Sequence, residues 1–316
     1  MIPALVLTAG LATRLRPLSF VRAKAAMPVA GQPLVQRILR WLASAGVTDA
    51  VLNLHHLPET ITGVVGNGAA DGLRVRYSWE MPILGSAGGP RHALSLLDSS
   101  AFLIVNGDTL TNVDVAALVA DHTRSGALVT MAVIPNTDAD KYSGLAVDAI
   151  GAFSGVVPRG ARQSSYHFVG VQVAEAEAFA TLPDDRPFES VRQLYPTLIA
   201  TRPGSVRTFV SSAEFFDIGT PADYLNTSLA FAARESASGS RIPDPGSRLK
   251  ECVVWDDVEV DDDARLRRCI LTDGVRVPAP SSWENMTIRV AHGELMETER
   301  LVGELAIGPI NGPTLG

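Results

Sequence analysis

The first 235 residues alternate between two hydrophobic patterns, and this alternation limits the fold more than any other feature of the chain. Short apolar runs, typical of β-strands, exchange with longer stretches in which apolar residues recur with the period of an α-helix. The expected strands are 2–7, 50–54, 73–79, 102–106 and 128–134, and the expected helices are 33–45, 113–125 and 222–235. Such alternation predicts a doubly wound α/β sheet, in which ligands bind at the carboxyl ends of the strands.

A second pattern, a 17-residue repeat, follows a Ser-, Gly- and Pro-rich stretch at 236–247 that is typical of a linker. Cys252 and Cys269 lie one repeat apart. At the same offset Val253 matches Ile270, Val254 matches Leu271, Asp256 matches Asp273, Val258 matches Val275, Val260 matches Val277, and a third partial copy holds Met286 and Ile288. A repeat this short predicts stacked β-solenoid coils, and we expect a short left-handed β-helix. The alternative is a chance match between two hairpin strands.

These patterns divide the chain into four expected segments. They are an α/β domain at 1–235, a linker at 236–249, a short β-helix at 250–292 and a C-terminal tail at 293–316. Near the start of the tail, after Gly293, we expect a short helix.

The composition narrows the class of protein. Apolar residues make up 46% of the 316 residues, so the chain can bury a large core. A net charge of −7 argues against a nucleic-acid partner, which a basic face would bind. Two cysteines cannot form a disulfide framework and are expected to be free core residues of a cytoplasmic protein. No apolar run approaches the roughly 18 residues of a membrane span, so no membrane partner is expected.

The segment 7–34 combines small residues with two cations. Gly10 follows the first expected strand, and Arg14 and Lys24 come after it. Small residues let a backbone approach a ligand closely, consecutive N–H groups can bind an anion, and Arg and Lys neutralise polyphosphate. The spacing matches neither the phosphate-binding GxxxxGK[ST] loop nor the dinucleotide motif GxGxxG. The alternative is a basic surface loop.

Two carboxylates stand at places where ligands are commonly held. The continuously apolar run 102–105 leads into Asn-Gly-Asp at 106–108. A carboxylate at the carboxyl end of a strand can hold a hard cation, although Asn-Gly also forms simple turns. Asp217 precedes Thr220 and Pro221, which are suited to cap and begin a helix.

Together these segments resemble the signature of the sugar-1-phosphate nucleotidyltransferases, and among them the mannose-1-phosphate guanylyltransferases. The family pattern L-x-A-G-x-x-T-R-L-x-P-L-T, then K, then P-V-x-G-x-P-L, matches residues 7–34, with Ser19 for Thr and alanines for the prolines beside Lys24. Residues 84–89 resemble the family's L-G-T-A-G loop, 102–108 its metal-binding aspartate and 215–221 its W-x-D-I-G-T-P motif. The resemblance covers roughly residues 2–235 and implies a Rossmann-like, doubly wound mixed sheet, and longer members carry a β-solenoid tail.

The resemblance also implies a reaction and a set of roles. An NTP and a sugar 1-phosphate would form a nucleoside-diphosphate sugar and pyrophosphate with Mg²⁺, in a homo-oligomer. The implied catalytic residues are Arg14, Lys24, Asp108 and Asp217, the two aspartates being the metal ligands. The implied nucleotide-binding residues are Leu7, Ala9, Gly10, Thr13, Gly85, Gly88, Asn106 and Gly107, and the implied sugar-binding residues are Gly144 and Gly170.

Two departures from the family pattern concern the sugar. The F-V-E-K-P motif of glucose- and mannose-type members is replaced at 153–158 by a run without the Glu-Lys pair, so Lys141, Arg159 or Arg162 would have to bind the sugar phosphate. The family's N-x-G is Phe-Val-Gly at 168–170, as in muramic-acid-type uridylyltransferases. We favour GTP with mannose 1-phosphate, because the β-solenoid tail resembles those enzymes. UTP with a glucose, amino-sugar or muramic-type 1-phosphate is the alternative, and a non-catalytic sugar-nucleotide-binding subunit is another.

Overall fold

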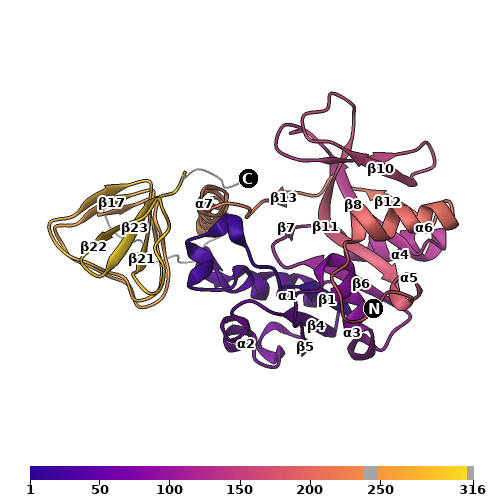
Figure 1. Cartoon of the computed structure of the whole chain (residues 1–316), viewed down its shortest axis with the longest axis horizontal. Coiled ribbons are helices and arrows are strands. Elements are labelled where there is room, and N and C mark those ends of the chain that lie inside the picture. The colour runs from indigo at the N-terminus through magenta and orange to yellow at the C-terminus, as the bar shows by residue number, and fades with distance from the viewer. Residues whose placement is uncertain (238–247, 312–316) are drawn as a thin grey trace. The chain divides into compact units, whose positions relative to one another are not determined.

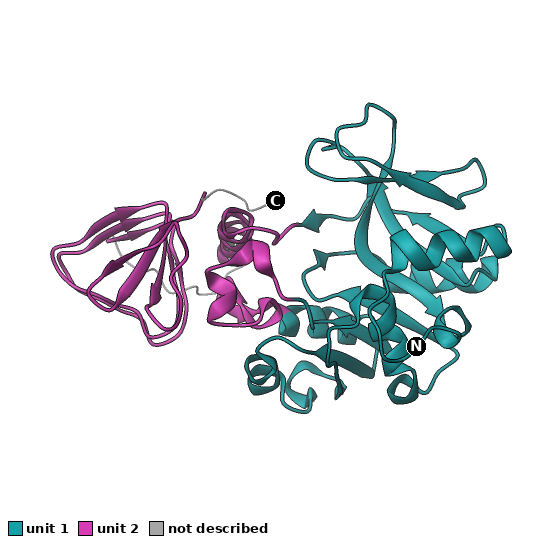
Figure 2. Cartoon of the chain, in the orientation of Figure 1, with its two compact units in different colours: residues 1–10, 35–216 teal, residues 11–34, 217–316 magenta. Residues whose placement is uncertain are grey.

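The computed structural model of the chain describes residues 1–237 and 248–311 (Figure 1). They form two compact units (Figure 2): residues 1–10 and 35–216 make the first, and residues 11–34 and 217–316 the second. The cation-bearing segment 11–34 therefore belongs with the C-terminal part of the chain. Most of the expected linker lies outside the described residues, but its first two residues, Ser236 and Ala237, still belong to a helix.

The first unit is built on a nine-stranded mixed sheet. In its parallel part β1 (Ala4–Leu7) lies between β6 (Ala101–Asn106) and β4 (Asp49–Leu54), and β4 pairs with β5 (Arg74–Trp79). The antiparallel strand β11 (Tyr166–Glu175) joins β6 on the other side. The remaining strands of this sheet are β8 (Val129–Pro135), β9 (Gly144–Val147), β10 (Phe153–Val157) and β12 (Val206–Val210). The expected α/β mixed sheet is confirmed, and its carboxyl-end loops follow β1, β4, β5 and β6.

Helices and short connections complete the first unit. They include α1 (Leu34–Ser44), α2 (Pro58–Val65), α3 (Gly85–Leu97), α4 (Val115–Ser125), α5 (Glu177–Ala180) and α6 (Tyr195–Thr201). Helix α3 packs on β1, β4 and β5, and α4 packs on β8 and β11 (Figure 1). Asp114 accepts a hydrogen bond from the Ala117 N–H at 2.9 Å, which caps α4, and Gly126 ends it with φ of 64°. A two-stranded ribbon, β7 (Leu110–Thr111) with β13 (Phe215–Phe216), lies outside the main sheet.

In the second unit each copy of the 17-residue repeat forms one coil of stacked β-strands. Three short parallel sheets stack there: β14 (Leu249–Lys250), β17 (Arg265–Arg267) and β20 (Ser282–Glu284); β15 (Val253–Val254), β18 (Ile270–Leu271) and β21 (Met286–Val290); β16 (Glu259–Val260) and β19 (Arg276–Val277). Val253 pairs with Ile270, and Ile270 pairs with Thr287, each 17 residues on. Because these pairs are parallel, the hairpin alternative is wrong. The left-handed sense of the coils stays a prediction.

The coils bury one side chain above the next. Leu266, Leu271, Val275 and Ile288 belong to one fully or nearly buried cluster. The two cysteines are free thiols, and the Cys269 N–H donates to Cys252 Sγ at 3.5 Å. Cys269 is buried in this core and Cys252 is half-buried against it, so the two cysteines are stacked as expected.

The prediction of a short helix after Gly293 is wrong. Residues 293–311 contain β22 (Arg300–Val302) and β23 (Leu305–Pro309), and β23 pairs antiparallel with β21. Leu305 and Ile307 are buried, so β23 covers the open edge of the last coil and extends its core. Within the described ranges, every helix lacks the length and apolar character needed to cross a bilayer.

Candidate active site

The loop after β1 is held by the neighbouring strand β4. The Thr8 N–H donates to Asn53 Oδ1 at 2.6 Å, the Ala9 N–H reaches the same oxygen at 3.4 Å, and the Thr8 hydroxyl donates to the Asn53 carbonyl at 2.5 Å. Thr8 and Ala9 are buried, whereas Gly10 is exposed with open space where a Cβ would stand. The loop therefore has a fixed base and an accessible backbone at its tip.

Asn53 also connects this loop to the next part of the site. Its Nδ2 donates to Glu80 Oε1 at 2.7 Å, and Glu80 Oε2 accepts from the Leu84 N–H at 2.8 Å. Glu80 follows β5 and is 4% exposed. One buried carboxylate thus ties the loop after β1 to the loop that opens α3. Sequence reasoning missed Asn53 and Glu80. Both are polar residues at the carboxyl ends of predicted strands, and that position was the available signal.

The predicted base-binding loop forms the first turn of α3. The Phe188 carbonyl accepts from the N–H groups of Ala87 at 2.8 Å and Gly88 at 3.2 Å. A Cβ on Gly88 would stand 3.0 Å from Leu84 Cβ and 3.1 Å from the Arg186 carbonyl oxygen. The absence of a side chain at Gly88 serves packing in this structure. The nucleotide contacts of Gly85 and Gly88 stay predictions.

The Asn-Gly-Asp segment lies directly beside the end of β1. The Gly107 N–H donates to the Leu7 carbonyl at 2.9 Å, and a Cβ on Gly107 would stand 2.5 Å from that oxygen. Gly170, with φ of +79°, packs so closely that its Cβ would lie 2.2 Å from Thr109 Oγ1 and 3.0 Å from Asn106 Cβ. The structure therefore brings the first predicted loop, the Asn-Gly-Asp turn and Gly170 together, and only glycine fits at two of these points.

Aromatic rings gather near the other predicted sugar-binding glycine. Gly144 begins β9, where a Cβ would lie 2.1 Å from Ser165 Oγ. Nearby, the rings of Tyr142, His167 and Phe215 form a cluster, in which the His167 centroid is 4.4 Å from that of Tyr142 and 4.6 Å from that of Phe215. The sequence assigned no role to Tyr142 or His167, because neither belongs to a recognisable spacing.

The predicted phosphate-binding cations lie in the second unit. Arg14 is exposed in a 3₁₀ turn at Thr13–Leu15, and Lys24 is half-buried in another at Lys24–Ala26. Thr13, Arg14 and Arg16 line a cavity of about 1030 Å³, whose other walls come from residues 17, 20, 220–222, 287, 292–299 and 308–311. A cavity of this size can hold a small ligand, and its wall contains Arg14 and Arg16 together with Glu294, Glu297 and Glu299.

Asp217 stands before α7 (Pro221–Ala237) in the second unit. Its carbonyl accepts from the Thr227 hydroxyl at 2.9 Å, and a Cβ on Gly219 would lie 3.1 Å from Asp217 Oδ1. The Thr220 hydroxyl accepts from the Asp223 N–H at 3.2 Å, which confirms the expected helix cap. Gly219 and Thr220 thus shape the turn that presents the Asp217 carboxylate.

The four predicted catalytic residues divide between the units: Asp108 lies in the first, and Arg14, Lys24 and Asp217 lie in the second. In the ranges 1–237 and 248–311, no group of three or more His, Cys, Asp or Glu side chains is arranged to hold a metal ion. The predicted metal ligands are two carboxylates only.

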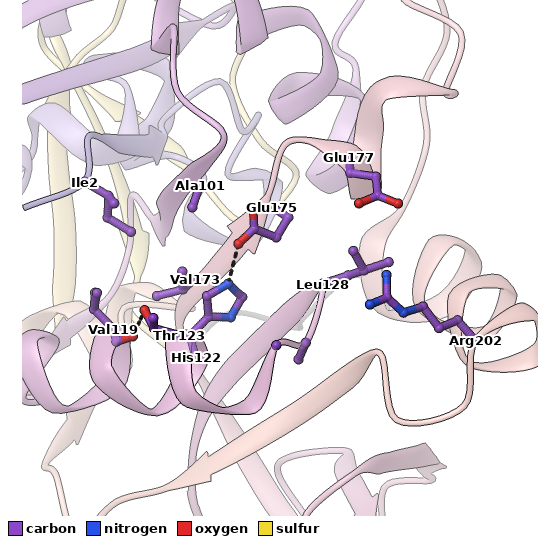
Figure 3. A pocket seen from close by; sticks show the side chains of 12 residues that line it. Ile2, Ala101, Val119, His122, Thr123, Leu128, Val173, Glu175, Glu177 and Arg202 are labelled. Atoms are coloured by element: carbon purple, nitrogen blue, oxygen red, sulfur yellow. Dashed lines mark hydrogen bonds and ion pairs between the residues drawn. The ribbon is translucent and has the colours of Figure 1, made fainter.

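Another cavity of the first unit, about 310 Å³, lies away from the predicted residues (Figure 3). Ile2, Ala101 and Leu128 line it, where β1, β6 and β8 begin, so it opens at the opposite edge of the sheet. His122 in its wall contacts Glu175 Oε1 at 3.2 Å and Thr130 Oγ1 at 2.8 Å. Both ring nitrogens are engaged within the protein, which makes His122 a structural residue.

Curated relatives of known activity cover much of the chain. Mannose-1-phosphate guanylyltransferase of Mycobacterium tuberculosis is 27% identical over 228 residues, which are 72% of this chain and 64% of that protein. N-acetylmuramate alpha-1-phosphate uridylyltransferase of Neisseria meningitidis is 42% identical over 116 residues, which are 36% of this chain and 50% of that protein. In both cases the match spans less than two thirds of the relative's length.

Solved structures and a family model agree with these relatives. HddC from Yersinia pseudotuberculosis superposes with a TM-score of 0.65 at 23% identity, covering 73% of this chain and all of that one, so the two share a fold. The family model described as nucleotidyl transferase matches residues 3–234. The expected family is confirmed, and the chain belongs to the nucleotidyl transferase family.

Proposed function

We propose that this protein transfers a nucleotidyl group from an NTP to a sugar 1-phosphate and releases pyrophosphate. One observation carries the proposal. The small-residue loop after β1 and the Asn-Gly-Asp turn after β6 meet at the carboxyl ends of adjacent parallel strands, joined by the Gly107 N–H and the Leu7 carbonyl. Doubly wound sheets bind their ligands at this edge.

The chemistry needs positioned charge more than a reactive side chain. An oxygen of the sugar phosphate forms a bond to the α-phosphorus, the bond from that phosphorus to the bridging oxygen breaks, and pyrophosphate leaves with the electron pair. The phosphate is already ionised, so no covalent enzyme intermediate is needed. In this proposal Arg14 binds the β- and γ-phosphates and Lys24 the α-phosphate, which lowers the barrier by orientation and charge neutralisation.

Asp108 and Asp217 are the proposed ligands of Mg²⁺. The ribbon of β7 and β13 supports this pairing, because Leu110 pairs antiparallel with Phe216. Asp108 precedes β7 by two residues and Asp217 follows β13 by one, so in the sequence the two aspartates flank paired ends of these strands. Two carboxylates plus substrate phosphates suit Mg²⁺, which would neutralise phosphate charge when bound.

For the substrates we propose GTP and mannose 1-phosphate. The Mycobacterium guanylyltransferase, which matches 72% of this chain, supports this choice. UTP with a muramic-type 1-phosphate is the second candidate, favoured by the 42% identity with the Neisseria uridylyltransferase over 116 residues and by Phe-Val-Gly at 168–170.

The proposal is tested by measuring pyrophosphate release with Mg²⁺ from a panel of NTPs and sugar 1-phosphates. We expect activity with at least one pair, with GTP and mannose 1-phosphate highest. Asp108→Asn and Lys24→Ala should each lower the rate by about 10²–10³, by analogy with other lost electrostatic contacts. Asp121→Asn is the matched control, because Asp121 pairs with Arg124 within α4, a helix that holds none of the predicted site residues. Near-normal rates for Asp108→Asn or Lys24→Ala, or silence of the unaltered protein across the panel, would contradict the proposal.

A further inference from the structure

Arg22 ties the cation-bearing segment 11–34 to the C-terminal coils. Its Nε and Nη2 donate to the two carboxylate oxygens of Asp273, both at 2.7 Å, and Nη2 also reaches Asp256 Oδ2 at 2.5 Å. Asp256 and Asp273 occupy the same place in successive coils, 17 residues apart. The Arg22 side chain is only 13% exposed. A two-point fork of this kind fixes direction as well as distance.

The Arg22 guanidinium in this contact is positively charged. Burial lowers the pKa of Arg22, but the hydrogen bonds to Asp273 and Asp256 outweigh burial, and the pKa of the guanidinium is raised. The Arg22 guanidinium also lies over the Trp255 ring, 5.3 Å from its centroid. Asp256 begins the acidic run 256–263, and Arg22 is its cationic partner.

A second tie reaches the segment beyond Lys24. Trp255 Nε1 donates to the Tyr224 hydroxyl at 2.8 Å, and that hydroxyl donates to the Pro28 carbonyl at 2.5 Å. Tyr224 belongs to α7 and is fully buried, and α7 packs on both β2 (Pro28–Val29) and β15. In the sequence, Lys24 therefore lies between Arg22, which bonds the coils directly, and Pro28, which is joined to Trp255 of the coils through Tyr224.

A third contact lies next to Arg14. The guanidinium groups of Arg16 and Arg289 both lie over the Phe20 ring, with their Cζ atoms 5.2 and 5.4 Å from its centroid. Arg289 is 2% exposed and forms a bidentate pair with Glu299 at 2.8 and 2.7 Å. Phe20 thus rests on a buried, fully hydrogen-bonded part of the last coil.

We propose that the C-terminal coils position Arg14 and Lys24 for polyphosphate, with Arg22 as the principal positioning residue. The segment needs such support because its only helices are three-residue 3₁₀ turns, which have few hydrogen bonds of their own. Holding it in place before substrate arrives removes an ordering cost from binding and catalysis. The catalytic part of this inference rests on the proposed function, whereas the anchoring does not.

Hydrogen exchange on the full chain tests the anchoring without substrate. The variants are Arg22→Gln, which removes the charge and the fork, and Arg22→Lys, which keeps only the charge. The matched control is Arg267→Gln, because the Arg267–Glu284 pair at 3.0 Å also joins successive coils but leaves 11–34 untouched. We expect amides of residues 11–28 to exchange about tenfold faster in Arg22→Gln, less in Arg22→Lys, and unchanged in Arg267→Gln. Equal exchange in all four proteins would overturn the inference.

Kinetics of the same proteins test the catalytic part. With the best substrate pair of the panel, we expect Arg22→Gln to lower kcat/KM by about ten- to a hundredfold, the scale of a small misplacement of positioned groups. Arg22→Lys should recover part of that loss, and Arg267→Gln should keep the unaltered rate. Faster exchange with an unchanged kcat/KM would overturn the positioning role. An unaltered protein that shows the exchange difference but no activity would contradict the proposed function and still support the anchoring.

Discussion

At the scale of single residues, the buried carboxylate of Glu80 joins two loops of the candidate site. It accepts hydrogen bonds from Asn53 Nδ2 and from the Leu84 N–H, and Asn53 in turn accepts from Thr8. A buried acceptor that serves two loops sets the distance between them. Glu80 therefore contributes by keeping these two loops ordered, because none of these groups needs to touch a substrate to do so.

Glu80→Gln is expected to weaken this junction. One carboxylate oxygen becomes an NH₂ group, which must face either the Leu84 N–H or Asn53 Nδ2, so one buried donor loses its acceptor. The free energy of unfolding should fall by about 1–3 kcal/mol. Urea unfolding measures the change, and Glu59→Gln on the exposed start of α2 is the control. Equal stability of the two variants would show that the Glu80 junction contributes little.

At the scale of elements, the strands of the coil stack pair with strands that are close to them in the sequence. Each short strand pairs with the residue 17 positions later, so every coil adds one layer to the same core. Strand β23 ends the stack by pairing antiparallel with β21. A middle strand such as β18 pairs with a strand on each side, so its buried residues should contribute most to the stability of the stack.

Leu271→Ala is expected to destabilise the stack strongly. Leu271 is fully buried in β18, between β15 and β21, and a cavity there should lower the free energy of unfolding by about 2–5 kcal/mol. Its partner in the preceding coil, Val254, is 36% exposed, and Val254→Ala should cost much less. Denaturant unfolding followed by tryptophan fluorescence compares them. A cost for Leu271→Ala no larger than for Val254→Ala would contradict the described core.

At the scale of the whole molecule, the chain does not divide where its sequence pattern changes. The pattern favours a boundary near residue 235, but the compact units place 11–34 and 217–237 with the coils. The contacts of Arg22, Phe20 and Tyr224 explain this membership.

Removing the coils by ending the chain at Ala237 is expected to disorder part of what remains. Tyr224 would lose its bond from Trp255, and Arg22 would lose both aspartates. We expect residues 11–34 to become protease-sensitive, with trypsin cutting after Arg14, Arg22 or Lys24, while the full chain resists under the same conditions. Equal resistance of the two proteins would mean that the coils do not support this segment.

Much of the fold could be predicted because its causes are local. The strands at β1, β4, β5 and β6 follow from short apolar runs, and the coils follow from a repeat that marks its own pairing partners. The residues of the nucleotidyl transferase signature are equally local, since they occupy loops of defined length. Periodicity and spacing are properties of the sequence itself, so these features could be predicted without the structure.

Other features were decided only by the tertiary structure. Glu80 and Asn53 come from different strands, and Arg22 and Asp273 are 251 residues apart, so no spacing connects them. A short helix is expected after Gly293, but this segment forms strands because the last coil offers an unpaired edge. The sequence by itself determined the pattern of elements and the residues suited to phosphate. Tertiary contacts decided which segments hold those residues in place, because that choice depends on the energy of pairing groups that are distant along the chain.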